Sequence, residues 1–515
     1  MARRVTMDAM IRRQDFAYQD DEFVLDLFSG FPISYLEPKS PIQRLLRKPD
    51  FQRETNHWNG EQIATFIASF LDNEVIPSLI LWRSPAAIFV IDGGHRLSAL
   101  RAWVEDDYGD GAISKKFFGE EISDEQKRIA KAARKLIENR IGRFTALREL
   151  VGSTGPELEV KRANILFARA LQVQWVQGDA SVAETSFFKI NSQGTPLDEI
   201  EELLIRNRRK PIPIGARAIL RAGTGHKYWS AFPEINTKRV EQLAKEFHEK
   251  LFQPEAEEPL KTLELPLGGS ASPIDALALL IEFLTVAGSR DLVPKAVNEY
   301  FDDKDGEDTT KILNNALHIL ERITGNQPQS LGLHPAVYFY NEKGKYSRFL
   351  FLGITLLITD AVRNNNGKFF KKFKTARARL EAFLIENKSL IGILLQNMGK
   401  TQRVPKIRDM LGYLVEQYCE DATPKPEDVI AHLGLRGRII DVVSTQAGTA
   451  FSDDTKSSVF VRKALEAALK CAECGGKLDP QKSVSYDHVK RVREGGNGHP
   501  DNAELTHPYC NSVKN

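Results

Sequence analysis

The sequence has few cysteines, no long apolar run and almost no net charge. Only four of its 515 residues are cysteine, and three of these lie within the last 45 residues. This distribution argues against a disulfide framework and fits a reducing cytoplasm. No apolar run approaches the roughly 18 residues that span a bilayer, and the charged N-terminus lacks the apolar segment of a secretory signal. We therefore expect a cytoplasmic protein with no membrane partner.

Two further absences narrow the possible classes. The sequence has no G-x-x-x-x-G-K-[ST] loop, so an ordinary Walker ATPase is excluded. The net charge of +2 favours no particular partner. At 515 residues, with 42% apolar and 27% charged residues, the chain has a globular composition. It is too long for one core, and we expect about two to four domains.

The most informative residues lie at the C-terminal end. A C-x2-C pair, Cys471 and Cys474, and an H-x2-C pair, His507 and Cys510, have the ligand spacing of a tetrahedral zinc site. Four protein ligands close such a site, which then supplies folding energy to a segment too small for a core of its own. The sequence therefore predicts a structural Zn²⁺.

Between the two pairs lie Asp487-His488, a Gly495-Gly496 turn and Asn502, and Asn511 follows Cys510. This order resembles the His-Asn-His (HNH) endonuclease family, with Asn511 in place of the final histidine. The resemblance implies a ββα fold that holds a catalytic divalent metal. His488 would then be the general base, and Asp487 and Asn511 would hold Mg²⁺ or Mn²⁺ through oxygen ligands. Asn502 would orient either the His488 ring or the loop that bears it.

A second candidate site lies near the N-terminus. Residues 80–82, 87–91 and 171–176 have the composition of strands, and residues 61–71 and 95–103 that of helices. Asp92-Gly93-Gly94-His95-Arg96 connects the second of these strands to a helix. Glycine allows a ligand to approach the backbone, and a helix N-terminus favours an anion. Arg96 can form paired bonds to phosphate, while His95 or Asp92 can handle a proton or a metal. A plain turn followed by a surface histidine and arginine is the alternative.

Two other segments accompany this turn in order. Gln52-Arg53 precedes Trp58, and Phe187 begins an F-x-x-x-N-x-x-G-x-x-L pattern. The three segments resemble the ParB/sulfiredoxin-like domain of GmrSD- and SspE-type phage-restriction proteins, over roughly residues 35–210. The resemblance implies nucleotide binding coupled to control of a nuclease. The implied nucleotide-binding residues are Gln52, Arg53, Asp92, Gly93, Gly94, His95 and Arg96. Gly94 stands where the family has glutamine, so hydrolysis of an NTP stays open.

Two basic segments leave their role open. Residues 127–148 hold eight basic residues against one acid, and in residues 363–379 seven basic residues are interleaved with Phe369, Phe370 and Phe373. Such segments can bind phosphates and stack on bases. The alternative is a solvated helix face whose phenylalanines lie in the core.

The sequence thus predicts an α+β multidomain protein. We expect an N-terminal arm at 1–34, a mixed α/β ParB-like domain at 35–210 and a mainly α-helical domain at 211–443. A flexible linker at 444–458 would then lead to a small zinc-stabilised ββα HNH domain at 459–515. The predicted function is that of a metal-dependent DNA endonuclease in phage defence or restriction, controlled by a domain that senses a nucleotide or modified DNA. A ParB-like DNA-binding regulator with a non-catalytic zinc module is the alternative. The oligomeric state, homo-oligomers included, stays open.

Overall fold

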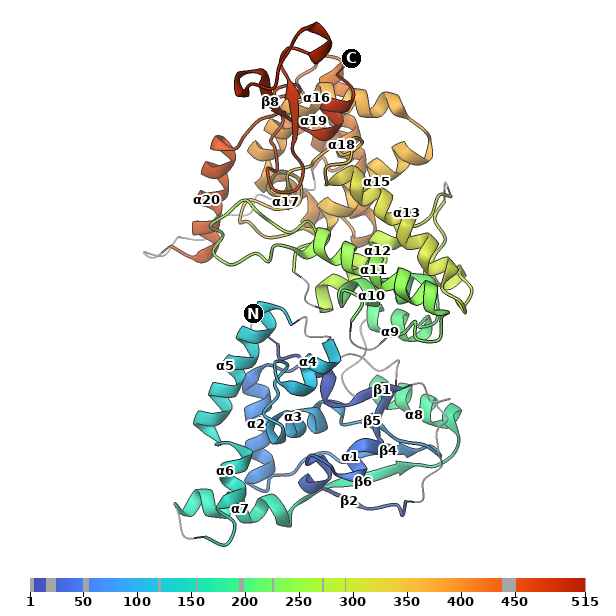
Figure 1. Cartoon of the computed structure of the whole chain (residues 1–515), viewed down its shortest axis with the longest axis vertical. Coiled ribbons are helices and arrows are strands. Elements are labelled where there is room, and N and C mark those ends of the chain that lie inside the picture. Colours follow the sequence, from blue (N-terminus) through green and yellow to red (C-terminus); the bar gives the residue numbers. More distant parts are fainter. Residues whose placement is uncertain are drawn as a thin grey trace. The chain divides into compact units, whose positions relative to one another are not determined.

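The chain forms two compact units in the computed structural model (Figure 1). The first unit is Met1–Arg208 with Thr224–Tyr228, and the second is Arg209–Gly223 with Trp229–Asn515. No described helix is both long and apolar enough to cross a membrane. The structure describes residues 4–14, 25–49, 55–118, 122–153, 156–193, 199–224, 227–270, 273–291, 293–437 and 451–514.

A six-stranded mixed sheet forms the middle of the first unit, in the order β1-β3-β5-β4-β6-β2. β1, β3 and β5 are parallel, β4 is antiparallel to β5 and parallel to β6, and β2 is antiparallel to β6. The strands predicted at 80–82, 87–91 and 171–176 are confirmed, and β4 and β5 form a hairpin. The strands are β1 (Arg12–Gln14), β2 (Gly30–Pro32), β3 (Leu46–Pro49), β4 (Leu79–Arg83), β5 (Ile88–Asp92) and β6 (Ala170–Val176).

The first four residues of the central strand β5 are apolar, and both faces of the strand are covered. Ile88 and Val90 point into a large core that includes residues of helices α2 and α3. Phe89 and Ile91 point into a smaller cluster that contains Phe187 of α8. Successive strand residues face opposite sides, so this run reads as continuously hydrophobic. The helices of the unit are α1 (Pro41–Leu45), α2 (Gly60–Leu71), α3 (Gly94–Val104), α4 (Ala112–Phe118), α5 (Asp124–Arg140), α6 (Phe144–Glu149), α7 (Glu157–Ala168), α8 (Ala180–Gln193) and α9 (Glu199–Arg206).

The N-terminal segment is part of this unit rather than an arm. Its described residues supply β1 and β2, which form the two edges of the sheet. Asp8 is only 3% exposed and its Oδ1 lies 2.8 Å from Nη2 of Arg13 and 2.9 Å from Nζ of Lys48. The predicted arm at 1–34 thus contributes two strands to the sheet within its described residues. The sequence did not indicate them because each is three residues long, and a period of two is not visible over three residues.

The second unit is helical up to its last segment, as predicted. Phe369, Phe370 and Phe373 of α16 are at most 8% exposed, so they are core residues and not base-stacking ones. The helices are α10 (Pro211–Leu220), α11 (Glu234–Phe252), α12 (Pro273–Ala287), α13 (Glu307–Ile323), α14 (Pro335–Tyr338), α15 (Arg348–Arg363), α16 (Gly367–Glu386), α17 (Lys388–Asn397), α18 (Arg403–Cys419), α19 (Pro426–His432) and α20 (Asp453–Ala467).

The chain ends in a ββα hairpin that packs directly on these helices. β7 (Ser485–His488) pairs antiparallel with β8 (Ala503–Thr506), and α21 (Pro508–Ser512) follows. Backbone N–H of Tyr509 donates to the Ser330 carbonyl at 2.9 Å, and Gly325 N–H donates to Oγ of Ser483 at 2.7 Å. The predicted flexible attachment is therefore replaced by a docked one. α20 also begins at Asp453, inside the predicted linker 444–458, the rest of which lies mostly outside the described residues.

Candidate metal nuclease site

The four predicted zinc ligands converge on one point. Sγ of Cys471, Cys474 and Cys510 and a ring nitrogen of His507 all lie within 4.8 Å of one another. Nδ1 of His507 is 3.4 Å from Sγ of Cys474 and 4.0 Å from Sγ of Cys510. His507 is fully buried, and Cys471 and Cys510 are at most 2% exposed. Three thiols and one imidazole in a mostly buried cluster have the chemistry of a structural zinc site.

The surroundings of His507 select the nitrogen that faces the cluster. Its Nε2 lies 3.0 Å from the carbonyl oxygen of Lys477, which can only accept a hydrogen bond. Nε2 therefore carries the proton, and Nδ1 presents its lone pair to the sulfur atoms. Burial also lowers the pKa of His507, which keeps the ring neutral as a metal ligand requires.

The three cysteine thiols influence one another's ionisation. Hydrogen bonds from the thiols of Cys474 and Cys510 lower the pKa of Cys471, and the interaction with Cys471 raises the pKa of Cys510. Three sulfur atoms so close together cannot all ionise without a cation between them. This competition fits a site that is completed by a divalent metal.

β7 presents the predicted catalytic pair on its two faces. Asp487 has a side chain only 14% exposed, whereas His488 is exposed. Oδ1 of Asp487 accepts a hydrogen bond from the backbone N–H of His488 at 2.8 Å. Because strand residues alternate, Asp487 shares its face with Ser485 and His488 shares the solvent face with Tyr486. The imidazole of His488 is thus open to a large substrate.

Asn511 lies beside the buried face of this strand. Its Nδ2 donates to Oγ of Ser485 at 2.7 Å and to the carbonyl of Tyr486 at 3.2 Å. Helix α21 therefore places Asn511 on the same side of β7 as Asp487. The two side chains that the HNH resemblance implies as metal ligands thus lie on one side of β7.

Asn502 holds the loop between the strands. Its Oδ1 accepts from the backbone N–H of Lys490 at 2.7 Å, and its Nδ2 donates to the carbonyls of Lys490 at 3.0 Å and Asn497 at 2.8 Å. Of the two roles expected for Asn502, these contacts fit the one in which it holds the loop. The glycine pair completes the turn, since a Cβ on Gly496 would lie 1.8 Å from the Lys490 carbonyl oxygen.

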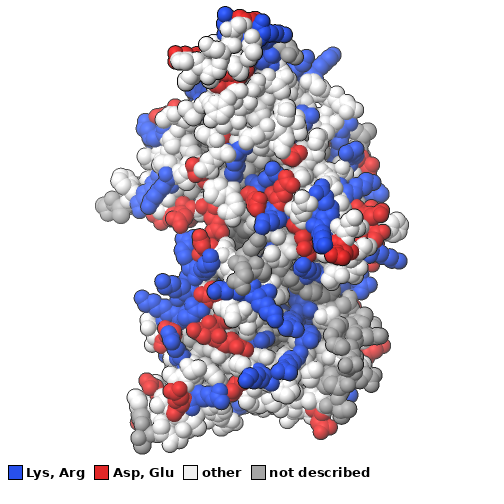
Figure 2. Space-filling model, viewed as in Figure 1, with Lys and Arg blue, Asp and Glu red and all other residues white. Residues whose placement is uncertain are grey.

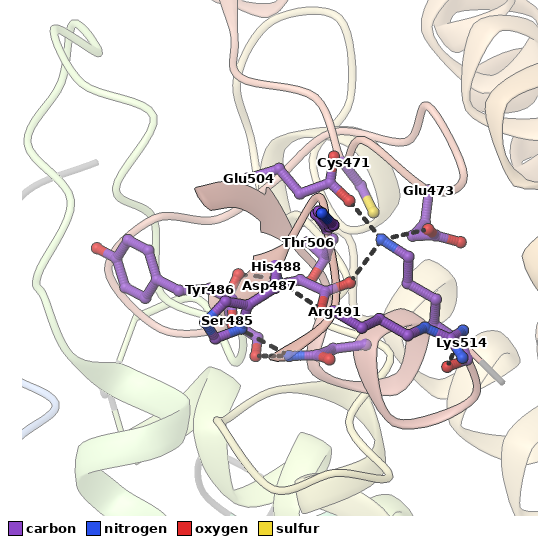
Figure 3. A network of polar contacts seen from close by, with 12 residues as sticks. Cys471, Glu473, Ser485, Tyr486, Asp487, His488, Arg491, Glu504, Thr506 and Lys514 are labelled. Atoms are coloured by element: carbon purple, nitrogen blue, oxygen red, sulfur yellow. Dashed lines mark hydrogen bonds and ion pairs between the residues drawn. The ribbon is translucent and has the colours of Figure 1, made fainter. Parts of the chain in front are cut away.

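Three residues that sequence reasoning missed surround Asp487 (Figure 3). Oε1 of Glu473, Oδ2 of Asp487 and Oε1 of Glu504 lie 3.2, 3.0 and 2.7 Å from Nζ of Lys514. Hydrogen bonds to Glu504 and Asp487 raise the pKa of Lys514. Burial opposes ionisation of Glu473, but hydrogen bonds from Lys374 and Lys514 lower its pKa overall. No local sequence pattern points to this cluster, because its members come from separate elements.

The N-terminal motif forms the predicted strand-turn-helix. Asp92 ends β5, Gly93 has φ +97° and α3 begins at Gly94. A Cβ on Gly93 would lie 2.4 Å from Cδ2 of Leu79, so this position requires glycine. Arg96 pairs with Asp92, with Nη2 and Oδ2 2.5 Å apart, and its Nη1 donates to the Pro77 carbonyl. In this structure Arg96 is thus engaged by the motif itself.

Two aromatic rings from the segment that follows Gln52-Arg53 lie close to the His95 ring. The His95 ring centroid is 5.7 Å from that of Trp58 and 5.6 Å from that of His57. Sequence reasoning had singled out Trp58 and missed His57. Gln52 and Arg53 lie outside the described residues, as do Gly194 and the rest of the third segment up to 198. Phe187 from the start of that segment packs against β5.

The basic segment 127–148 is largely paired with acids of its own unit. Nε of Arg134 lies 2.8 Å from Oδ1 of Asp106, and Nη1 of Arg148 lies 2.9 Å from Oε2 of Glu37. Figure 2 shows blue and red side chains interspersed on the visible face of the first unit. Most of this segment's charge therefore belongs to solvated ion pairs and does not by itself indicate a DNA-binding patch.

Comparison with known families finds one match within each unit. The family model described as HNH endonuclease matches residues 471–515, and that of the GmrSD restriction endonuclease N-terminal domain matches residues 38–209. No curated protein and no solved structure matches the chain.

The HNH match identifies a metal-dependent nuclease that hydrolyses phosphodiester bonds, with DNA as substrate. More particularly, the chain joins a GmrSD-type N-terminal domain to a C-terminal HNH domain, a combination that supports a phage-defence restriction nuclease.

Proposed function

We propose that the C-terminal module cuts DNA with His488 as general base and Asp487 and Asn511 as ligands of a Mg²⁺ or Mn²⁺ ion. The observation that carries this proposal is the arrangement on β7. Asp487 and Asn511 lie on the α21 side of the strand, and His488 lies on the exposed side. Carboxylate and amide oxygens are ligands that such hard cations prefer.

The chain's own residues would divide the work as follows. His488 is placed to take a proton from an attacking water, which a neutral imidazole does near pH 7. Asn502 fixes the loop that follows His488, and the exposed side of β7 admits the DNA strand. A divalent metal, when bound, supplies stabilisation of the leaving 3′ oxygen.

We further propose that Cys471, Cys474, His507 and Cys510 hold a structural Zn²⁺. The buried imidazole with its proton fixed on Nε2 and the three converging thiols support this assignment. A thiol-rich zinc cluster also suits the cytoplasm, where thiols stay reduced.

The N-terminal unit is proposed to sense a nucleotide or modified DNA, such as that of a phage, and to control the nuclease. Asp92, Gly93, Gly94, His95 and Arg96 would form its binding turn together with Gln52 and Arg53. The Asp92–Arg96 pair supports a competitive mode, in which a ligand phosphate takes the place of the Asp92 carboxylate at the guanidinium. Hydrolysis of an NTP is not part of this proposal.

A cleavage experiment tests the nuclease assignment. Supercoiled plasmid and Mg²⁺ or Mn²⁺ are incubated with the wild type, with His488→Ala and with His499→Ala. His499 is a matched control because it is an exposed histidine of the same module, with 64% of its side chain accessible. We expect cutting by the wild type and His499→Ala, and a loss of about a hundredfold or more in His488→Ala. Equal cutting by both variants would exclude this active site.

The alternative function is a ParB-like DNA-binding regulator whose zinc module is not catalytic. The exposed Lys490 and Arg493 beside β7 favour DNA contact in either case, since backbone phosphates bind cations without regard to sequence. A mobility shift of the plasmid without nicking under any divalent metal supports this alternative.

A further inference from the structure

Two acids face each other across the ββα hairpin. Asp487 of β7 and Glu504 of β8 are direct cross-strand partners in the antiparallel register. Glu473, in the turn that carries the first zinc ligands, adds a third carboxylate, and one oxygen of each lies within 4.8 Å of the others. Like charges directly opposed on a sheet are destabilising. The hairpin therefore needs a cation at this place.

Lys514 supplies that cation. Its ammonium has three N–H donors, and three carboxylate oxygens lie 2.7 to 3.2 Å away (Figure 3). The backbone around it is fixed, because Nη2 of Arg491 donates to the Lys514 carbonyl at 3.1 Å. Lys374 of α16 neutralises the other oxygen of Glu473 at 3.0 Å. Figure 3 shows the Lys514 amine between the three acids.

This cluster contains Asp487, the carboxylate proposed to hold the catalytic metal. Three carboxylates without a lysine between them are strong oxygen ligands for a divalent ion. Such an ion would bind among Glu473, Asp487 and Glu504, in the space that the Lys514 ammonium fills, whereas Asn511 contacts Ser485 and the Tyr486 carbonyl. We propose that Lys514 is a positioning residue, whose ammonium fills the space between the three carboxylates and so keeps a divalent ion from binding among them instead of between Asp487 and Asn511. This inference rests on the proposed function of the module.

The proposal predicts an unusual pair of effects for Lys514→Met. Removing a positive charge about 3 Å from Asp487 strengthens the attraction for a divalent cation, and we expect Mn²⁺ to bind about tenfold more tightly. Plasmid cleavage at saturating Mn²⁺ should nevertheless fall about tenfold or more, because the ion is held in the wrong place. A lysine that merely stabilised the hairpin would give weaker Mn²⁺ binding together with weaker cleavage.

The experiment measures Mn²⁺ binding by calorimetry on the zinc-loaded full chain, beside its zinc content and its cleavage rate. Lys514→Arg, which keeps the charge, should retain affinity near that of the wild type. In Lys514→Met/Glu504→Gln, where one competing carboxylate is gone, Mn²⁺ should bind more weakly than in Lys514→Met. If Lys514→Met loses zinc, the same comparison is made in the Glu504→Gln background, where the opposed charges are absent.

Each result of this experiment either supports or overturns the proposed role of Lys514. Tighter Mn²⁺ binding with slower cutting supports the role of Lys514, and unchanged or weaker binding overturns it while the nuclease assignment stands. If Mn²⁺ binding in the wild type is no stronger than in Asp487→Ala, the metal assignment itself fails, and the inference about Lys514 fails with it.

Discussion

The two motif-bearing turns of this protein differ in how their charged residues are engaged. At the N-terminal turn, Asp92 and Arg96 pair with each other at 2.5 Å. In the C-terminal module the zinc ligands all point inward, and Asp487 is held by a lysine while His488 faces solvent. The charged residues of the N-terminal turn thus bind each other, whereas the C-terminal module presents His488 to solvent from a strand beside the zinc cluster.

This difference suggests two modes of action. A preorganised site loses little free energy to rearrangement when its substrate arrives. A self-paired site must break a contact before it binds, so its affinity is lower but its occupancy changes its own structure. The first arrangement suits catalysis, and the second suits sensing. Substitutions at the zinc ligands, at Asp487 and at the Asp92–Arg96 pair test this contrast.

Folding of the nuclease module should depend on zinc. In Cys471→Ser we expect loss of about one zinc ion and unfolding of the module, because structural zinc binding contributes roughly 10–16 kcal/mol of folding free energy in small zinc domains. Metal analysis and amide hydrogen exchange over residues 471–514 measure both. Cys419→Ser, outside the cluster, should keep its zinc. A wild type without zinc would refute the ligand assignment.

Asp487 should matter for catalysis and little for folding. Asp487→Ala removes a ligand of the catalytic metal, which is worth several kcal/mol of stabilisation, so cleavage should fall about a hundredfold or more. Asp501→Ala is the control, since Asp501 is an acid of the same module with 93% of its side chain exposed. Cleavage is followed as the rate of plasmid nicking. Retained cutting by Asp487→Ala would remove the proposed asymmetry between the two sites.

Substitutions of Arg96 and of Asp92 should change the nucleotide affinity of the N-terminal turn in opposite directions. Arg96→Ala removes a charge-assisted contact worth about 1.5–3 kcal/mol and should weaken nucleotide binding about ten- to a hundredfold. Asp92→Asn removes the carboxylate that competes for the Arg96 guanidinium, so nucleotide binding should tighten. Calorimetry with the common NTPs measures both, and Arg140→Ala, an exposed arginine paired with Glu61, serves as control. Weakening by both variants would indicate that the pair acts as a structural unit and not as a competitor.

The smallest effect concerns the backbone of the sensing turn. Gly93→Ala should destabilise the first unit by about 1–3 kcal/mol because its φ is +97° and the new Cβ would lie 2.4 Å from Leu79. Gly142→Ala separates the two causes. Gly142 has a φ of +98° but no atom within 4 Å of the added Cβ. Hydrogen exchange of β5 and α3 should therefore change more in Gly93→Ala, and equal changes would mean that backbone strain alone matters.

Much of the site was predictable because its signals are local. The spacing of Cys471, Cys474, His507 and Cys510 identified a cluster that the structure closes to within 4.8 Å. Strand β5, the Gly93 turn and helix α3 follow from the run Ile88–Leu97, where an apolar strand meets two glycines. The helices between 211 and 420 follow from apolar periodicity.

Other features could not be predicted because their causes lie far apart in the chain. The sequence places Glu504 near Asp487 only if the register across a long Gly-rich loop is known, and Lys514 is unremarkable by itself. Strands β1 and β2 are too short to show a period. The docking of the nuclease module includes the backbone contact from Tyr509 to Ser330, which has no side-chain signature, and the Lys374–Glu473 ion pair, whose members lie about a hundred residues apart in the chain.

The candidate ligands at both ends of the protein could be predicted from the sequence, since ligand identity and spacing are properties of short segments. The partner of each charge depends on the fold: Arg96 pairs with Asp92, most of the basic segment 127–148 is paired, and Lys514 lies among three carboxylates. The physical reason is that electrostatic energy depends on distance through space, and the fold alone brings together charges that the chain keeps apart.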